Sequence, residues 1–285
     1  MDINKTTVTL QLHASGYCTH REFVTISGGS WGHVRYPAGY AVIEHPQHGI
    51  LLFDTGYASR FLEATRPFPY SLYAKTTPVC LGESAASQLQ RRGVRPEDVK
   101  RIIVSHFHGD HIAGLRDFPN AEFMASRKAY EAVKRLKGVS AVRRGFVPAL
   151  LPDDFEHRLS PIEETPHIAL PEQHPFHAVG GYDLFADGSL IAVDVSGHAE
   201  GQFGLFLRTA RNECFLCADA VWSSAAYREE RPPHPAAGLI MPSRRQYRES
   251  FLRLVELHKR YPDVRIIPSH CMEAWSRHIE GGEPL

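Results

Sequence analysis

Three histidines and an aspartate lie within six residues of the chain, in the stretch His106–His111 (HFHGDH). Neutral imidazole and carboxylate are ligands that zinc and other divalent transition metals prefer. The run 101–104 before it predicts a short buried strand, so the polar residues would lie where a strand ends and a loop begins. Burying such groups without partners would cost roughly 1–3 kcal/mol each. We therefore favour a metal site over a solvated loop that is rich in histidine.

Three further candidate ligands stand just past other apolar runs. These are His198 after residues 190–195, Asp219 after 213–218 and His270 after 264–267. A single histidine after a strand is more often a surface residue or a satisfied core residue. The repetition at three strand ends instead predicts that these side chains meet at one edge of a sheet.

Short strands and a few amphipathic helices must position these residues. Apolar or alternating runs predict strands at 7–13, 40–44, 50–54, 101–104, 121–125, 182–185, 190–195, 202–208, 214–218 and 264–268. Helical spacing predicts helices at 83–92, 127–137 and 243–260. Residues 16–36 predict a long loop and residues 58–80 irregular structure, while 139–180 predicts an irregular insertion that lies over the site as a lid or substrate wall.

The composition is that of an ordinary globular protein, with 43% hydrophobic and 22% charged residues among 285. The 32 basic and 32 acidic residues cancel, and no basic run stands out, so neither nucleic acid nor an anionic membrane is an expected partner. No apolar stretch approaches the roughly 20 residues of a membrane span. No secretory signal is visible at the N-terminus, so we expect a cytoplasmic protein.

Two other spaced pairs invite a metal or redox interpretation, and we favour a structural role for both. The five cysteines are odd in number and scattered, which fits a reducing compartment. Cys214 and Cys217 lie in one predicted strand, where positions three apart point to opposite faces. Pro175 argues against a helix that would align His174 with His177.

In combination, these motifs resemble the metallo-β-lactamase superfamily. The resemblance runs from about residue 7 to about residue 275 and rests on His106-x-His108-x-Asp110-His111, then His198, Asp219 and His270, with Asp54 upstream in Phe53-Asp-Thr-Gly56. It implies an α/β (α+β) fold, a four-layer αββα sandwich with the site at one edge of two packed sheets. A single domain of residues 1–285 would follow.

The resemblance also implies two metal ions and a division of the ligands between them. The first ion would take His106, His108 and His198, the second Asp110, His111 and His270, and Asp219 would bridge them. Asp54 would orient a ligand without binding metal, although a turn residue before Gly56 is an alternative. We expect zinc, with manganese or iron as alternatives.

Within the superfamily, the chain is similar to the small hydrolases that include acyl-homoserine lactonases and glyoxalase II. A bridging hydroxide would attack an ester, lactone, thioester or phosphoester of a small molecule. Asp110 would carry the proton to the leaving group, or serve as a metal ligand only. A phosphodiesterase or phosphotriesterase would need Arg or Lys near the metals, for which Arg244 and Arg245 are candidates. A signal-binding protein with low turnover is a third alternative.

The chain departs from the lactonase pattern at two positions. Trp222 stands three residues after Asp219, where those lactonases often carry a tyrosine aimed at the substrate carbonyl, and Gln202 replaces the last histidine of His-x-x-Gly-His. We expect Trp222, Phe107 and Tyr17 to line the substrate pocket, with core packing as the alternative. The aromatic N-terminal loop would form a pocket wall or the surface of a homodimer.

Overall fold

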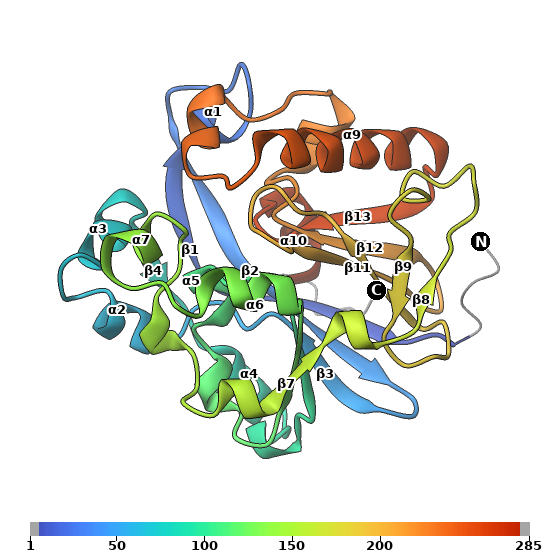
Figure 1. The fold of residues 1–285 in the computed structure, drawn as a ribbon, viewed down its shortest axis with the longest axis horizontal. Coiled ribbons are helices and arrows are strands. Elements are labelled where there is room, and N and C mark those ends of the chain that lie inside the picture. The colour runs from blue at the N-terminus through green and yellow to red at the C-terminus, as the bar shows by residue number, and fades with distance from the viewer. Residues whose placement is uncertain (1–5, 280–285) are drawn as a thin grey trace.

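The computed structural model describes residues 6–279, which form two β-sheets packed face to face with helices on both outer sides (Figure 1). One sheet has the strand order β4-β1-β2-β3-β5-β6-β7. Its strands are β1 (Thr9–Arg21), β2 (His33–His45), β3 (Gly49–Phe53), β4 (Val79–Leu81), β5 (Arg101–Val104), β6 (Glu122–Ala125) and β7 (Leu159–Pro161). The predicted αββα sandwich is confirmed.

The second sheet has the order β13-β12-β11-β10-β9-β8. Its strands are β8 (His167–Ile168), β9 (Gly181–Asp183), β10 (Leu190–Asp194), β11 (Phe203–Arg208), β12 (Glu213–Ala218) and β13 (Val264–Pro268). Strand β13 runs parallel to β12, whereas β10, β11 and β12 alternate in direction. The chain therefore leaves β10, β12 and β13 at the same edge of this sheet.

The helices are short apart from one long helix on the outer face of the second sheet (Figure 1). They are α1 (Glu22–Thr25), α2 (Arg60–Ala64), α3 (Ser71–Thr76), α4 (Ala85–Arg91), α5 (Gly109–Ile112), α6 (Arg127–Val133), α7 (Gly138–Val142), α8 (Ser224–Arg228), α9 (Arg244–Arg260) and α10 (Met272–Ile279). Short 3-10 turns lie at Pro96–Asp98, Leu115–Asp117, Pro148–Leu150, Phe155–Arg158, Ile162–Glu164 and Pro235–Leu239. No helix within residues 6–279 is long and apolar enough to cross a membrane.

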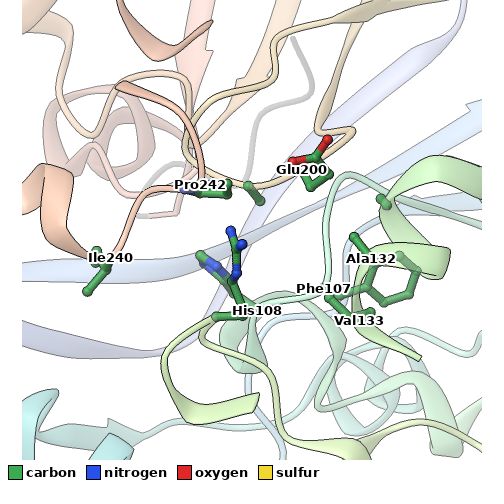
Figure 2. A pocket seen from close by; sticks show the side chains of 10 residues that line it. Phe107, His108, Ala132, Val133, Glu200, Ile240 and Pro242 are labelled. Atoms are coloured by element: carbon green, nitrogen blue, oxygen red, sulfur yellow. The ribbon is translucent and has the colours of Figure 1, made fainter. Parts of the chain in front are cut away.

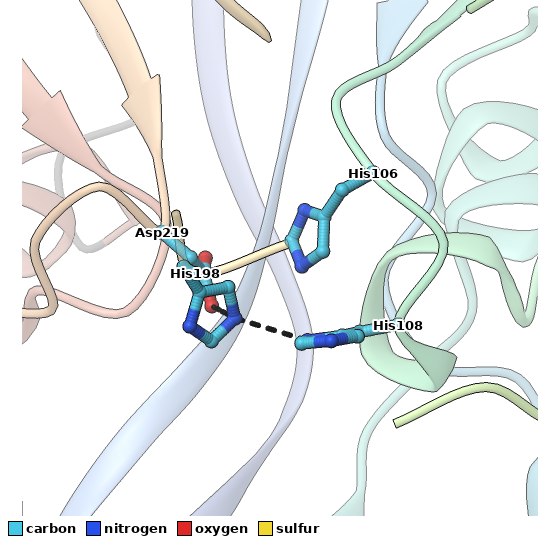
Figure 3. A group of neighbouring side chains, drawn as sticks. All are labelled: His106, His108, His198 and Asp219. Carbon is cyan, nitrogen blue, oxygen red and sulfur yellow. Dashed lines mark hydrogen bonds and ion pairs between the residues drawn. The ribbon is translucent and has the colours of Figure 1, made fainter. Parts of the chain in front are cut away.

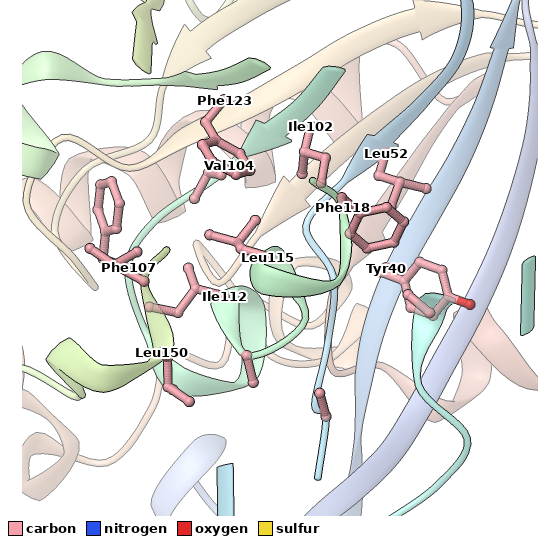
Figure 4. Packing of buried hydrophobic residues seen from close by; sticks show 14 of the residues in the cluster. Tyr40, Leu52, Ile102, Val104, Phe107, Ile112, Leu115, Phe118, Phe123 and Leu150 are labelled. Carbon is pink, nitrogen blue, oxygen red and sulfur yellow. The ribbon is translucent and has the colours of Figure 1, made fainter. Parts of the chain in front are cut away.

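Successive side chains along each strand point to alternate faces of its sheet, and this divides the apolar side chains among three layers. Leu51 and Ile103 pack between the sheets, while their neighbours Leu52 and Ile102 face the helices that cover the first sheet (Figure 4). Side chains at successive strand positions point to opposite faces, which produces this division. Phe215 and Phe251 belong to the third layer, between the second sheet and α9.

The cysteine pair follows the same rule. Cys214 packs between the sheets, whereas Cys217 belongs to the layer under α9. Both thiols are free, as are those of the other cysteines. The prediction that this pair shares neither a disulfide nor a face of its strand is confirmed.

The prediction of a long loop at 16–36 is wrong for most of that range. Strand β1 continues to Arg21 and β2 begins at His33, so only α1 and residues 26–32 separate them. The alternation that marks a strand is broken because the β1–β2 register shifts between Ala14 and Tyr17, where Gly16 has a φ of +115°. Such a bulge bends the strand and hides its period from the sequence.

Two segments predicted as irregular contain short elements. Residues 58–80 include α2, α3 and β4, and residues 139–180 include most of α7, then β7 and β8. Elements of two to six residues are too short to show a clear hydrophobic period. Within the second segment, Val142, Arg143 and Gly145 line the large cavity described below.

Candidate metal centre

The seven predicted ligands converge at one edge of the two sheets. Each follows a strand or the loop after it: His106 to His111 follow β5, His198 follows β10, Asp219 follows β12 and His270 follows β13. Asp54 follows β3, which runs parallel to β5 and so ends at the same edge. The fold thus gathers residues that lie up to 164 positions apart, from His106 to His270.

One group of potential ligands contains His106, His108, His198 and Asp219, whose ligand atoms lie within 4.8 Å of one another (Figure 3). Nε2 of His198 lies 3.0 Å from Nδ1 of His108 and 3.2 Å from Oδ2 of Asp219. These side chains come from both sheets and point toward a common centre, as the figure shows.

The second group contains Asp110, His111 and His270, again with ligand atoms within 4.8 Å of one another. Asp219 contacts this group too, because its Oδ1 lies 3.3 Å from Nε2 of His111 and its Oδ2 lies 3.0 Å from Nε2 of His270. Oδ2 of Asp110 lies 3.4 Å from the same His270 nitrogen. Asp219 therefore stands between the two groups and touches both.

Three of the histidines have their other ring nitrogen held by a neighbour. The partners of Nδ1 are Ser105 Oγ for His106 at 3.0 Å, Asp54 Oδ2 for His111 at 2.7 Å and the Pro37 carbonyl for His270 at 2.7 Å. Such partners fix the orientation of a ring and leave Nε2 facing inward, which is the usual arrangement around a metal.

Asp54 is fully buried and lies behind the ligands instead of among them. Its Oδ1 accepts the Ser105 backbone N–H at 2.8 Å, and its Oδ2 accepts the Ser105 hydroxyl and the His111 ring N–H, each at 2.7 Å. The backbone of Asp54 has a φ of 60°, a conformation that is rare for residues other than glycine and is found at functional sites. These contacts join the end of β3 to the end of β5.

The histidines of the centre divide into two electrostatic environments. Burial lowers the pKa of His106 well below its ordinary value and lowers that of His108 to about 3. Both rings are therefore neutral at physiological pH, the form that binds metal. For His111, burial would lower the pKa, but the carboxylates of Asp219, Asp54 and Asp110 outweigh it and raise the pKa well above its ordinary value. This carboxylate-rich half favours a cation.

The residues present fit a metal centre. The inward-facing Nε2 atoms of His106 and His111 and Oδ1 of Asp219 are buried and have no hydrogen-bond partner among the described residues. Buried polar atoms without partners are rare and costly. Imidazole nitrogens and carboxylate oxygens are the donors that divalent transition metals prefer, so bound ions would satisfy these atoms together.

A cavity of about 270 Å³ opens beside the centre. His108, Asp110, His198, Asp219 and His270 reach it from the ligand set. Much of the rest of its wall is apolar and comes from α1, α7, the segment after Asp219 and the Pro235–Leu239 turn region. A cavity with a few convergent polar groups in an apolar wall is typical of a small-molecule site.

Trp222 lines this cavity, and its indole nitrogen already has a hydrogen-bond partner in the protein. The indole N–H donates to Oδ2 of Asp219 at 3.2 Å, and the ring meets the His198 ring edge to face, with centroids 5.4 Å apart. The side chain is only 9% exposed. Trp222 therefore lies at the site, as expected, but its indole N–H binds Asp219 and is not free to bind substrate.

The other two residues expected to bind substrate do not line the large cavity. Phe107 is buried, packs against Tyr130 and Phe155, and faces a small cavity on another side of His108 (Figure 2). Tyr17 alternates along β1 with Cys18, which does line the large cavity, and packs under the guanidinium of Arg35. Adjacent strand positions face opposite ways, so Tyr17 points away from the cavity.

Gln202 and the two arginines considered for phosphate binding also lie away from the ligands. Gln202 is buried, and its amide donates to the Val195 carbonyl at 3.2 Å, so it supports the loop that carries His198. Arg244 bonds the Gly238 carbonyl and Arg245 pairs with Glu249 on exposed helix surface. Neither arginine lines the large cavity.

Two cavity residues were not anticipated from the sequence. The hydroxyl of Tyr73, on α3, donates to Oδ1 of Asp110 at 3.4 Å. A Cβ on Gly109 would lie 2.8 Å from the Phe61 ring and 3.2 Å from the Tyr73 ring, which explains the glycine inside the histidine motif. The second residue is Arg143, at the end of α7. The irregular sequence around each gave no signal of its position.

A third cluster of potential ligands, His45, His48 and Asp187, lies between two hairpins. Nδ1 of His45 accepts the backbone N–H groups of Gln47 and His48 at 3.1 and 3.2 Å. A neutral ring then carries its proton on Nε2, which faces Ser189 and Asp187 and has no lone pair for a metal. This cluster ties the hairpins together.

Comparison with known proteins agrees with this geometry. Residues 40–270 match the family model of the metallo-beta-lactamase superfamily. Relatives include a probable metallo-hydrolase of Mycobacterium bovis, 26% identical over 81% of this chain and 74% of the relative, and the N-acyl homoserine lactonase AttM of Azorhizobium caulinodans, 25% identical over 88% of each.

Solved structures show the same fold. An N-acyl homoserine lactone hydrolase determined with the product N-hexanoyl-L-homoserine at its catalytic metal centre is 21% identical, with a TM-score of 0.73 over 98% of this chain and all of that one. The dizinc quorum-quenching lactonase AidC is 14% identical, with a TM-score of 0.60 over 94% of this chain and 89% of that one. By its family match over residues 40–270, its sandwich fold and its ligand geometry, the chain belongs to the metallo-β-lactamase superfamily.

Proposed function

We propose that this metallo-hydrolase holds two divalent metal ions, with zinc as the first candidate, and hydrolyses an ester-like bond, with a lactone as the first candidate. The observation that carries the proposal is the position of Asp219. Its two carboxylate oxygens face Nε2 of His111 at 3.3 Å and Nε2 of His198 at 3.2 Å, which belong to different ligand groups. A carboxylate in this position suits a bridge between two ions.

His106, His108 and His198 would hold one ion, Asp110, His111 and His270 the other, and Asp219 both. Two bound ions would supply a hydroxide nucleophile at neutral pH and polarise the substrate carbonyl. Asp54 would keep the His111 ring turned toward its ion through the 2.7 Å hydrogen bond. The ions would also neutralise the two carboxylates of the centre.

The contacts of Asp110 support a role in proton transfer. Its Oδ2 faces His270 at 3.4 Å, and its Oδ1 faces the Tyr73 hydroxyl at 3.4 Å beside the cavity. As the carbonyl carbon gains a bond to the nucleophile oxygen and loses its bond to the leaving oxygen, Asp110 would take the proton of the nucleophile and deliver it to the leaving alkoxide. The products are a carboxylate and an alcohol, joined in one molecule when the substrate is a lactone.

The names of the relatives support a lactone as the first candidate among the ester-like bonds. Curated relatives that are 23–25% identical and cover most of this chain are named N-acyl homoserine lactonases. The cavity is of small-molecule size and mainly apolar, as an acyl chain requires. Trp222 departs from the lactonase pattern that the sequence resembles. Its indole N–H donates to Asp219, so other groups would have to contact the substrate carbonyl.

A substrate panel tests the proposal. The zinc-loaded protein would be assayed with an acyl-homoserine lactone, a p-nitrophenyl ester, a thioester and p-nitrophenyl phosphoesters, with the chelated protein as the control. We expect hydrolysis of the lactone or the carboxylic ester, lost on chelation and restored by added metal. Hydrolysis of phosphoesters alone would assign a phosphoesterase. Tight lactone binding with no turnover of any substrate would assign a signal-binding protein, and either result would overturn the proposal.

A further inference from the structure

A strongly basic segment borders the cavity. Residues 132–152 contain no acidic residue and five basic ones, namely Lys134, Arg135, Lys137, Arg143 and Arg144. Lys134 pairs with Glu131 and Glu156. Within residues 6–279, no carboxylate lies within ion-pair distance of the other four. The segment therefore keeps a surplus of positive charge beside the site, although the whole chain has no net charge.

Arg143 is held in a defined place at the end of α7. The Gly138 N–H at the start of the helix donates to the Tyr70 hydroxyl at 3.0 Å, and the Arg143 N–H donates to the Val139 carbonyl at 3.0 Å. The turn closes at Gly145, which has a φ of +60° that favours glycine. The backbone that presents Arg143 is thus fixed at both ends of the helix.

The same turn touches the metal centre. The Gly145 carbonyl accepts the Gly109 N–H at 3.1 Å, and a Cβ on Gly145 would lie 2.6 Å from Cδ2 of His108. Two residues span at most about 7 Å of chain. The Cα of Arg143 is therefore at most about 7 Å from that of a residue in contact with a predicted metal ligand, and its long side chain is within reach of a small substrate bound there.

Among residues 6–279, Arg143 is the only lysine or arginine that lines the large cavity. Its neighbours in the wall include the apolar side chains of Val24, Val142, Ala237 and Ile240. Arg144, the next residue, lines instead the small cavity that contains Glu200 (Figure 2 shows that cavity). Two adjacent arginines with the same charge thus face different spaces.

We infer that Arg143 binds an anionic group, a carboxylate or a phosphate, at the end of the substrate that is remote from the bond cleaved. A guanidinium presents a planar fork of N–H donors that matches both anions, and Arg143 has no protein carboxylate to compete for it. The basic segment around it would raise the local concentration of anionic substrates. The inference rests on the proposed hydrolysis and names the class of ester-like substrate that the site prefers.

Three esters that differ only at the far end of the acyl chain test this. They are p-nitrophenyl hexanoate, mono-p-nitrophenyl adipate and p-nitrophenyl ω-phosphooxyhexanoate, assayed with the zinc-loaded full-length protein. We expect kcat/KM for one or both anionic esters to exceed that for the hexanoate by about five- to tenfold, the size of a charge-assisted hydrogen bond at a partly exposed site. The comparison of adipate with phosphate identifies which anion is preferred.

Arg143→Gln should abolish the preference for the anionic ester, mainly by raising KM for that ester. Arg143→Lys should keep part of the preference because the charge remains. Arg144→Gln, the matched control, should keep the full preference. Circular dichroism would show that each variant is folded. Added salt should reduce the wild-type preference.

An equal kcat/KM for all three esters in the wild type, or a preference that persists in Arg143→Gln, would overturn the inference while hydrolysis itself stands. If the metal-loaded protein hydrolysed none of the esters and no lactone, the proposed function would fail and the inference with it. The two failures are therefore distinguishable.

Discussion

The indole N–H of Trp222 donates a hydrogen bond to Oδ2 of Asp219 at 3.2 Å. The same oxygen faces Nε2 of His270 at 3.0 Å and Nε2 of His198 at 3.2 Å. Trp222 thus supports a carboxylate of the candidate metal centre. This contact links the wall of the large cavity to the ligand set.

Trp222→Phe should weaken metal binding by about tenfold, the lower end of the range for loss of a ligand's hydrogen-bond partner. Phenylalanine keeps the ring beside His198 but cannot donate to Asp219. Competition with a chelator would measure the affinity. Trp275→Phe is the control, because the Trp275 indole donates to the Pro268 carbonyl in the core between the sheets. Equal affinities for wild type and Trp222→Phe would contradict this role.

Asp54→Asn should lower metal affinity by about 10- to 100-fold. The two carboxylate oxygens accept the ring N–H of His111 and two hydrogen bonds from Ser105. The asparagine amide replaces one of these oxygens with an NH2 group, which cannot accept a hydrogen bond. Zinc titration with a competing chelator provides the readout. Asp183→Asn removes a buried carboxylate that accepts the Gly188 N–H away from the centre, so it should reduce stability without changing zinc affinity. A similar loss of zinc affinity in both variants would refute the prediction.

Tyr73→Phe should lower kcat by about tenfold and leave KM within about twofold. The substitution keeps the ring that packs on Phe61 and Gly109 and removes the hydroxyl that donates to Asp110. The expected fall in kcat corresponds to the loss of about one hydrogen bond to a charged group. Steady-state kinetics on the best substrate of the panel would measure both constants.

The matched variant is Tyr36→Phe, which removes a cavity phenol whose hydroxyl pairs with Thr25 at 2.5 Å. Its effect on kcat should be smaller. If Tyr36→Phe lowers kcat as much as Tyr73→Phe, loss of any cavity phenol explains the effect and the contact with Asp110 carries no special role.

His174 should make folding stability depend on pH in the acid range. Burial lowers its pKa to about 4, and its Nε2 has no partner among the described residues. Because the unfolded ring has a pKa near 6.5, it takes up a proton first, and the stability gained from the neutral buried ring is lost as the pH falls from about 6.5 to about 4. This loss is at most about 1.4 kcal/mol per pH unit for one proton.

His174→Phe keeps an aromatic ring among Phe176, Phe206 and Tyr261 and removes the titration. Urea unfolding between pH 7 and 4 should show a shallower fall in stability for the variant than for the wild type. His13, whose pKa burial and Arg92 lower to about 4, remains in both proteins and contributes equally. Parallel pH curves would show that His174 does not contribute.

The ligands were predictable from the sequence because each follows an apolar strand, and strand direction then sets the edge at which it lies. His198, Asp219 and His270 are placed by β10, β12 and β13, whose alternation is regular. The layered sandwich follows from the same alternation, which sends Leu51 and Leu52 to opposite faces.

The cavity wall was less predictable, because packing between distant segments decides it. Tyr73 reaches Asp110 from a proline-containing segment without a hydrophobic period. Arg143 directly follows a short helix, between its last residue and a glycine turn. Phe107 stands between two predicted ligands in sequence, yet its side chain enters the core. Proximity in sequence to a ligand therefore says little about which side chains face the substrate.

The metal content of the centre tests the account most directly. Anomalous diffraction from crystals of the zinc-loaded protein should show two peaks of similar height roughly 3.5–4 Å apart, one beside His106, His108 and His198 and the other beside Asp110, His111 and His270, with Asp219 between them. A single peak, or no peak among these seven residues, would contradict the proposed dinuclear centre.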